Sequence, residues 1–261
     1  MIRALVSAAT GMQAQQTNLD VIANNLANVN TVGFKKSQAM FEDMLYDNVR
    51  PVGGTQGAGG SSVPAGVQVG LGTRLVSTSK VFSAGQLQNT GRDLDLAIQG
   101  TGFFQIQLPD GTFGYTRAGN FNVDNNGKWT TPDGYYLDGA PALAVNRTNL
   151  SVTANGTVSQ VVAGTTSEIG QIKLYRFANP SGLQALGQNL FQKTDASGDP
   201  QAGIAGLDGF GTLQEGTLET SNVDVVTEMV NLIMAQRAYE VNTKAVQASD
   251  EILQSTNNMK R

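Results

Sequence analysis

The residue types that most often carry catalysis are scarce in this chain. Its 261 residues contain no Cys and no His, which removes disulfides, thiol nucleophiles, thiolate metal sites and the commonest general base. Asp93 and Asp95 alternate along a strand-like segment, and paired carboxylates are how glycosidases divide acid and base roles. Alternating charge on a solvated strand face is far commoner, so we expect no catalytic residue, no metal site and no cofactor.

Short glycine motifs give no stronger sign of a ligand. None has the third glycine, or the strand-to-helix context, of a dinucleotide-binding loop; they are Gly70-Leu71-Gly72, Gly100-Thr101-Gly102 and Gly209-Phe210-Gly211. The loop Asp124-Asn125-Asn126-Gly127 lacks the alternating acidic positions and closing Glu of a calcium loop. We interpret these segments as turns or bulges.

The composition of the chain limits the classes of partner that it is expected to bind. Charged residues make up 15% of the chain, against about 25% in typical globular proteins, and the net charge is -4 without any basic block. We therefore expect no nucleic-acid partner. No apolar run is long enough for a membrane span or a secretory signal, which predicts no membrane insertion and either a cytosolic protein or export without a cleaved signal peptide.

A heptad pattern near the N-terminus predicts a helix over residues 3–30. We expect Gly33 to close this helix in the left-handed conformation. The apolar positions that recur at this spacing form a candidate assembly seam: Leu5, Met12, Leu19, Ile22 and Leu26.

A second heptad pattern predicts a long C-terminal helix that begins at Asn222. Ser221 and Asp224 fit a capping box at its start. Its candidate seam is Val225, Leu232, Tyr239, Val246 and Leu253. The ordinary interpretation of each pattern is a helix buried in a core. The alternative is that the terminal helices form an antiparallel pair, or pack against neighbouring subunits.

Between the helices the apolar period falls to two from Arg74 to about Leu218, with turn residues between the runs. The glycine-rich stretch after Arg50 is either a flexible linker or an arm that becomes ordered on assembly. The sequence thus predicts an α+β protein with an inserted antiparallel β-rich domain. The expected domains are a helical domain from 1–33 and 220–261, an extended arm over 34–73, and a β-rich domain over 74–219.

Residues 23–35 closely resemble the signature of bacterial flagellar basal-body rod and hook proteins. The motif residues are Asn24, Asn25, Leu26, Ala27, Asn28, Gly33 and Phe34. Segments 221–224, 228–231 and 236–245 resemble the C-terminal end of that family, and segments 100–104 and 115–121 resemble its middle domain. The likeness spans nearly the whole chain.

The resemblance implies a non-enzymatic structural subunit that self-assembles into a helical, hollow and rigid drive shaft carrying motor torque to the hook. The chain's length and the extended segment after Asp43-Met44-Leu45-Tyr46 favour the distal part of the rod. The terminal helices would form a coiled-coil-like inner layer, and the β-rich domain an outer layer.

The resemblance also implies partners and a location. The partners would be further copies of the chain, the proximal rod and hook proteins, the peptidoglycan and outer-membrane ring proteins, and the flagellar type III export apparatus. The location would be the basal body, in the rod that spans the periplasm. The alternatives are another axial protein, from the hook or the proximal rod, and a peptidoglycan-cleaving enzyme that uses Asp93 or Asp95.

Overall fold

The computed structural model describes residues 2–50, 66–144, 146–162 and 164–259. Most of the glycine-rich stretch, including the glycines from Gly53 to Gly60, lies outside these ranges. The chain divides into two compact units. The helix-and-ribbon unit comprises Met1–Leu26, Ser37–Ser79 and Val225–Arg261, and the β-rich unit comprises Ala27–Lys36 and Lys80–Asp224.

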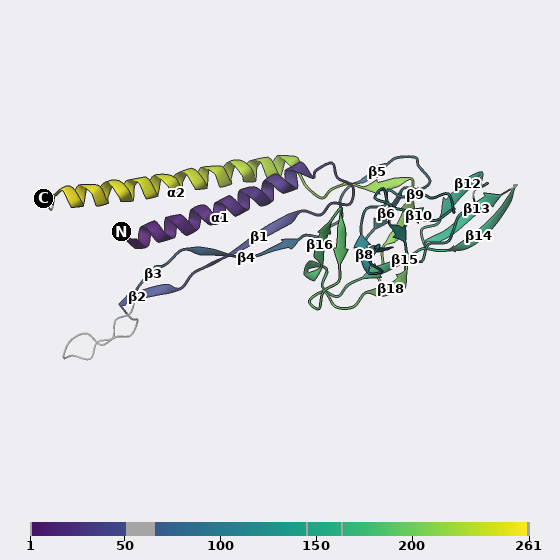
Figure 1. The fold of residues 1–261 in the computed structure, drawn as a ribbon, viewed down its shortest axis with the longest axis horizontal. Coiled ribbons are helices and arrows are strands. Elements are labelled where there is room, and N and C mark those ends of the chain that lie inside the picture. The colour runs from purple at the N-terminus through teal and green to yellow at the C-terminus, as the bar shows by residue number, and fades with distance from the viewer. Residues whose placement is uncertain (1, 51–65, 145, 163, 260–261) are drawn as a thin grey trace. The chain divides into compact units, whose positions relative to one another are not determined.

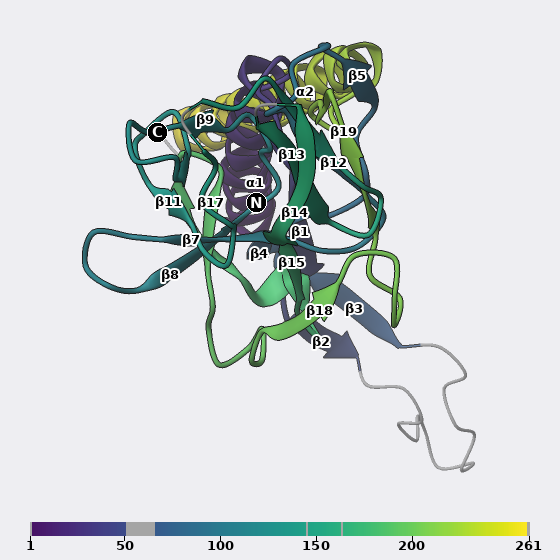
Figure 2. The same ribbon diagram turned by 90° about the vertical axis from the view of Figure 1, so that its right-hand side faces the viewer.

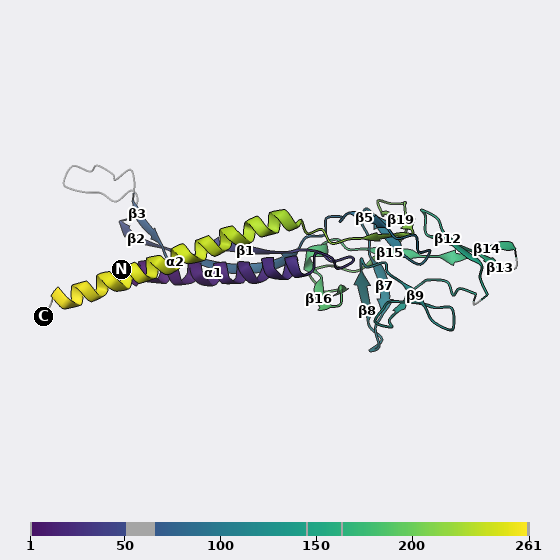
Figure 3. The same ribbon diagram turned by 90° about the horizontal axis from the view of Figure 1, so that it is seen from above.

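Two helices dominate the helix-and-ribbon unit. Helix α1 spans Ile2–Ala27 and helix α2 spans Val225–Met259, and they run in opposite directions (Figures 1 and 3). Helix α2 begins three residues later than the capping-box pattern predicts. Ser221 Oγ accepts a hydrogen bond from the Val223 N–H at 3.3 Å, so it acts in the turn before the helix.

The helices touch near the middle of each. Thr243 Oγ1 lies 3.5 Å from the sulfur of Met12. A β-carbon added at Gly11 would lie 3.0 Å from Asn242 Nδ2. Glycine in a helix interior costs about 1 kcal/mol relative to alanine, and here its missing side chain allows the close approach of α2.

A long two-stranded ribbon follows α1. Strand β1 (Ser37–Asp43) pairs with β4 (Thr73–Lys80), and β2 (Tyr46–Arg50) pairs with β3 (Val67–Gly70). The Met44 N–H donates to the Gly72 carbonyl at 2.8 Å and joins the two pairs.

The ribbon is held along the length of α1. The Thr73 N–H donates to Thr10 Oγ1 at 3.4 Å, and Arg3 forms an ion pair with Asp47. The part of the predicted arm that the structure describes is therefore a β ribbon packed against the first helix.

Antiparallel strands form the β-rich unit (Figure 2). A seven-stranded sheet contains, in spatial order, β16 (Gln184–Gly187), β17 (Leu190–Gln192), β8 (Phe113–Thr116), β7 (Phe104–Gln107), β11 (Tyr136–Leu137), β10 (Trp129–Thr130) and β9 (Asn122–Val123). A three-stranded sheet contains β12 (Asn149–Val152), β13 (Thr157–Val162) and β14 (Thr165–Gln171).

Three further strand pairs complete this unit, together with a short 3-10 turn at Pro180–Gly182. The pairs are β15 (Lys173–Arg176) with β18 (Gln201–Ile204), β19 (Thr212–Glu215) with β6 (Leu96–Gln99), and β20 (Thr217–Glu219) with β5 (Leu87–Asn89). The predicted α+β class, with two terminal helices and an inserted antiparallel β-rich part, is confirmed.

The main core lies in the β-rich unit and includes the single tryptophan, Trp129, which is buried against Phe121. The expectation of strands with one buried face is wrong for β6, because Leu96, Ala97 and Ile98 are all buried. The β-rich unit also contains a second cluster of buried side chains: Phe103, Tyr115, Phe177, Leu183 and Phe191. A strand that is covered on both faces loses the alternation that marks a solvated face.

Within their described residues, neither α1 nor α2 combines the length and the apolar character needed to cross a lipid bilayer.

Candidate assembly site

The signature residues form the turn that leads from α1 into β1. Asn25 is 2% exposed. Its side-chain amide donates to the Ser37 carbonyl at 2.9 Å and accepts from the Ser37 N–H at 2.8 Å. An amide side chain carries both a donor and an acceptor, so Asn25 pairs with Ser37 as a neighbouring strand would. This pairing fixes the path of the chain into the ribbon.

Gly33 serves this turn and does not cap the helix, since α1 ends at Ala27. Its φ is +69°, and a β-carbon there would lie 2.5 Å from the Ala118 nitrogen. The Gly33 N–H donates to the Glu219 carbonyl at 2.8 Å. The prediction of a left-handed Gly33 was right about the conformation and wrong about its role, which is close approach to the strand-end segment at Ala118.

The other motif residues lie in the chain on either side of Gly33. Phe34 is buried, with Lys80 Nζ 4.4 Å from the centre of its ring. Asn28 Oδ1 accepts from Thr31 Oγ1 at 3.2 Å. Leu26 is half-buried, and Asn24 and Ala27 are exposed.

A buried ionic cluster lies directly after the motif. Lys35 Nζ is 2.6 Å from Glu219 Oε1 and Arg117 Nε is 2.9 Å from Glu219 Oε2. Lys35 and Glu219 side chains have no exposed surface, and Arg117 has 4%. Nothing in the sequence pattern indicated this cluster, because its members are 102 and 184 residues from Glu219 along the chain.

The cluster perturbs the pKa values of its members. Burial alone would raise the pKa of Glu219, but attraction and hydrogen bonds from Arg117 and Lys35 outweigh burial and hold that pKa below its ordinary value. Burial lowers the pKa of Lys35 against the opposing attraction of Glu219. Glu219 is thus an ionised carboxylate shared by two cations.

The predicted seam of α1 is mostly covered in the single chain. Ile22 is buried, and Leu5, Met12, Leu19 and Leu26 are half-buried. Met12 is the member that reaches α2, through Thr243.

The predicted seam of α2 is less covered. Leu232 and Val246 are half-buried, whereas Val225, Tyr239 and Leu253 are exposed. The helix pair within one chain therefore leaves part of this seam open to another surface.

Helix α2 also carries a larger exposed apolar set that the heptad analysis missed. Its members, here called the α2 apolar face, are 50 to 70% exposed: Val226, Met229, Val230, Ile233, Met234 and Val241. The signal in the sequence was the dense apolar composition from 225 to 235, because a helix that is apolar on several sides is normally surrounded by protein.

The ribbon carries a second exposed apolar set that the sequence analysis missed. Leu45 is 83% exposed, and Tyr46, Val49, Val67 and Val76 are also exposed. Both long edges of a two-stranded ribbon also have unpaired backbone groups.

The two carboxylates considered for catalysis lie in different environments. They precede β6 in a turn and do not share a strand face. Asp93 is exposed, whereas the Asp95 side chain is 2% exposed, accepts from Thr90 Oγ1 at 2.7 Å and lies 3.5 Å from Arg92. Asp95 is therefore engaged in holding the turn.

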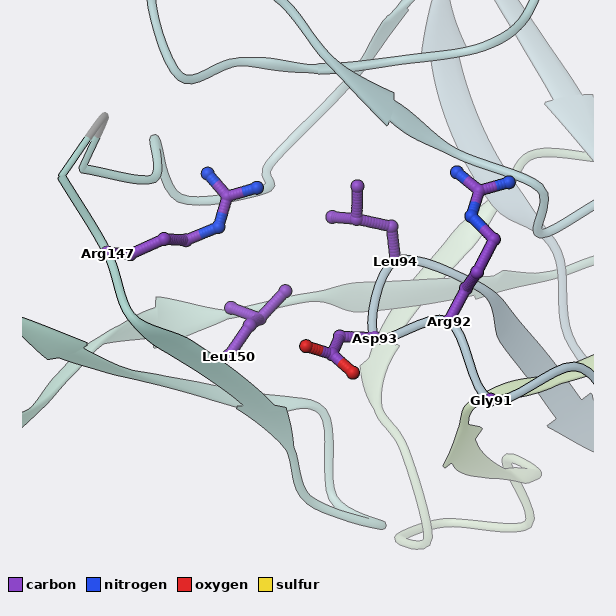
Figure 4. Close-up of a pocket in the computed structure, with 6 residues that line it drawn as sticks. All are labelled: Gly91, Arg92, Asp93, Leu94, Arg147 and Leu150. Carbon is purple, nitrogen blue, oxygen red and sulfur yellow. The ribbon is translucent and has the colours of Figure 1, made fainter.

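A surface depression of about 310 Å³ lies beside this turn. Figure 4 shows Arg92 and Arg147 on opposite sides of it, with Leu94 and Leu150 between them. Arg92 already donates to the Phe121 carbonyl and to Asn122 Oδ1, and Asp93 adds a negative charge to the lining. The charges of the depression are largely balanced by the chain itself.

Across the part of the chain that the structure describes, no group of three or more Asp, Glu, His or Cys side chains is placed to hold a metal ion. The described residues present exposed apolar surfaces and a buried ionic junction, and both suit packing against other protein surfaces.

Comparison with protein families gives three matches along the chain. Residues 5–35 match the flagella basal body rod protein family, residues 97–160 match the flagellar hook protein FlgE/F/G D1 domain, and residues 214–259 match the flagellar basal body rod FlgEFG protein C-terminal family. The first match contains the signature turn, and the last match contains the whole of α2.

Curated relatives match over full length. Flagellar basal-body rod protein FlgG of Borreliella burgdorferi is 46% identical and that of Bacillus subtilis is 43% identical, each with all of both chains covered. FlgG of Buchnera aphidicola from Acyrthosiphon pisum is 46% identical over 97% of this chain and 98% of the relative. Flagellar hook protein FlgE of Escherichia coli is only 25% identical, over an alignment of 420 residues.

Proposed function

The chain belongs to the FlgG family of flagellar basal-body rod proteins, and we propose that it assembles by packing its α2 apolar face and its ribbon against further copies of itself. It is a structural subunit of the flagellar rod in the basal body. The proposal concerns how one subunit joins the next, and the α2 apolar face is the observation that carries it.

The exposure of that face is unusual for a protein that acts alone. Monomeric proteins rarely expose large contiguous apolar patches, and such patches normally mark an interaction surface. Burying apolar surface contributes about 25 cal/mol for each Å² removed from water. The exposed side chains of α2 are therefore a source of association free energy that a single chain leaves unused.

The first helix supports the same assembly from its composition. Its 26 residues carry only two charged side chains, Arg3 and Asp20. A helix that faces solvent usually carries pairs of Glu and Lys. We infer that α1 and α2 together form the inner layer of the rod, with the predicted seams contacting neighbouring subunits.

Contacts between different surfaces of identical subunits generate a helical polymer when they do not close into a ring. The α2 apolar face and the ribbon are different surfaces, so their mutual contact would extend into a helical polymer if the rotation between subunits does not close a ring. We propose that the product is the hollow, rigid distal rod that carries motor torque to the hook.

The finer points of partners and location follow from this assignment as proposals. The neighbours along the axis would be the proximal rod and hook proteins, and the surrounding partners would be the peptidoglycan and outer-membrane ring proteins. We propose that the subunit reaches the periplasm through the flagellar type III export apparatus without a cleaved signal peptide. We also propose that it has no enzymatic activity.

A charge placed on the α2 apolar face tests the assembly proposal. Ile233→Asp should abolish rod formation and motility in cells that lack their own copy, because the aspartate would be buried without a partner in every subunit contact. Ile233→Leu is the matched control and should assemble, since it keeps the apolar surface. Normal swimming with Ile233→Asp would contradict the proposal, provided that immunoblots show equal amounts of both variants.

A further inference from the structure

The buried cluster around Glu219 joins segments that are far apart in the chain. Glu219 Oε1 accepts from Lys35 Nζ at 2.6 Å and from the Gly85 N–H at 2.9 Å. Glu219 Oε2 accepts from Arg117 Nε at 2.9 Å. One carboxylate therefore connects the segment after the signature turn, the segment before β5 and the end of β8.

Arg117 is fixed in place independently of Glu219. Its remaining donors reach the carbonyl group of Ile98 in β6 and those of Gly100 and Gly102 in the β6–β7 connection, at 2.8 to 3.2 Å. The guanidinium charge is therefore a permanent part of the interior of the β-rich unit. Arginine does not lose its proton in proteins, so this charge requires a counter-ion.

Glu219 is the counter-ion for both buried cations. The ion pairs of Lys35 and Arg117 within the described residues both end on its carboxylate. A further cation lies close to the cluster, because Lys80 Nζ donates to the Lys35 carbonyl at 3.0 Å. Without the Glu219 carboxylate, the β-rich unit would contain two buried cations and no anion to balance them.

The segment around Glu219 brings additional bonds to the same place. Asn222 Oδ1 accepts from the Lys36 N–H at 2.8 Å, and Asn222 Nδ2 donates to the Val81 carbonyl at 2.8 Å. Strand β20, which carries Glu219, pairs with β5. Residues 217–222 therefore close the β-rich unit by both charge and hydrogen bonds.

We propose that Glu219 is a latch, and that the β-rich unit closes only when residues 217–222 dock and supply its carboxylate. The cost of leaving a charge buried and unpaired is comparable with the whole stability of a domain. Every other strand of the unit precedes residue 217, so folding of the unit waits for nearly the last segment before α2.

The latch predicts an order of stability loss among variants. This order differs from the one expected if only the packing of side chains mattered. Glu219→Gln keeps the shape of the side chain but leaves two cations, and we expect it to lower the folding equilibrium constant more than 100-fold. Lys35→Met leaves the balanced pair of Arg117 and Glu219, and we expect a loss below tenfold. Adding Lys35→Met to Glu219→Gln should restore part of the loss, because one unpaired cation is removed.

The full-length chain provides its own probe for this test. Trp129 is the single tryptophan and is buried in the β-rich unit, so urea unfolding followed by its fluorescence reports on that unit. Asp199→Asn is the control, because Asp199 pairs with Lys193 at the surface and should shift the constant less than twofold. Two results together would overturn the latch: Lys35→Met and Glu219→Gln lower the folding equilibrium constant by the same factor, and the double variant lowers it by the product of the two factors.

The order of closure has a second readout in the unaltered chain. Pulse-labelled hydrogen exchange during refolding should show β6, β7 and β8 gaining protection in the same phase as β20. Protection of β6 to β8 in a phase that precedes protection of β20 would overturn the proposal, even if the variants were destabilised as expected.

Discussion

At Gly33 the backbone has a φ of +69°, and a β-carbon would lie 2.5 Å from the Ala118 nitrogen. Gly33→Ala should therefore suffer both a strained backbone and a clash with another backbone segment. Gly111 has a similar φ of +79° with nothing within 4 Å, so Gly111→Ala bears the backbone strain alone, about 1 to 2 kcal/mol.

We expect Gly33→Ala to lose about 1 to 3 kcal/mol more free energy of unfolding than Gly111→Ala, because the close approach must be relieved by backbone shifts. Urea unfolding followed by Trp129 fluorescence measures both. Equal losses from the two substitutions would show that the approach to Ala118 has no energetic role.

The Glu219 carboxylate should make the β-rich unit sensitive to acid. Its pKa is held below the ordinary value of 4.5 by Arg117 and Lys35. A lowered pKa in the folded state means that the stabilising contribution is fully present above about pH 4.5 and is lost as the pH falls through the lower folded value.

When the urea midpoint of the native chain is measured at a series of pH values, it should therefore decrease as the pH is lowered below about 4.5. Glu219→Gln removes this titration and should show a weaker dependence over the same range. If the urea midpoints of the two proteins depended equally on pH, the ionisation of Glu219 would not be linked to the stability of the β-rich unit.

The signature positions were predictable from the sequence, but the groups that they contact were not. Asn25, Gly33 and Phe34 stand out by their resemblance to a family motif, while their partners Ser37, Ala118 and Lys80 do not. A residue that contributes only backbone atoms to a contact can be of almost any type, so the sequence does not identify it as a partner. The Glu219 cluster was missed for the related reason that its cations are remote along the chain.

At the scale of elements, the join between α1 and β1 depends on one side chain. Asn25→Ala would leave the N–H and carbonyl of Ser37 without the bonds that Asn25 makes. We expect a loss of about 1 to 3 kcal/mol from such unsatisfied groups.

Hydrogen exchange at Ser37 and along β1 is the most direct readout of that loss, and protection should fall there. Asn30→Ala is the matched control, because Asn30 is an exposed asparagine of the same turn. If both substitutions left exchange in β1 unchanged, the pairing of Asn25 with Ser37 would be dispensable.

The elements themselves were predictable to different degrees. Heptad spacing located both helices to within a few residues, because helix periodicity is a local property. Strand β6 broke the expected alternation, because its successive residues Leu96, Ala97 and Ile98 are all buried. The ribbon pairs residues on either side of the glycine-rich stretch, and no local sequence pattern encodes a pairing between segments so far apart in the chain.

At the scale of the whole molecule, the chain concentrates its core in one unit and its exposed apolar surface in the other. The β-rich unit contains both aromatic cores and the Glu219 latch. The helix-and-ribbon unit exposes Leu45 and the α2 apolar face. This division suits a subunit whose β-rich part is stable alone while its helices and ribbon gain their stability from neighbours.

We expect the α2 apolar face to be exposed in the free subunit and buried in the rod. The chain has no native cysteine, so Ile233→Cys introduces a single thiol at the centre of that face. A water-soluble maleimide should label this thiol fully in the dilute purified chain and poorly in isolated basal bodies, with recovery of full labelling after the basal bodies are denatured. Equal labelling of the free chain and the intact basal bodies would show that assembly does not bury this face.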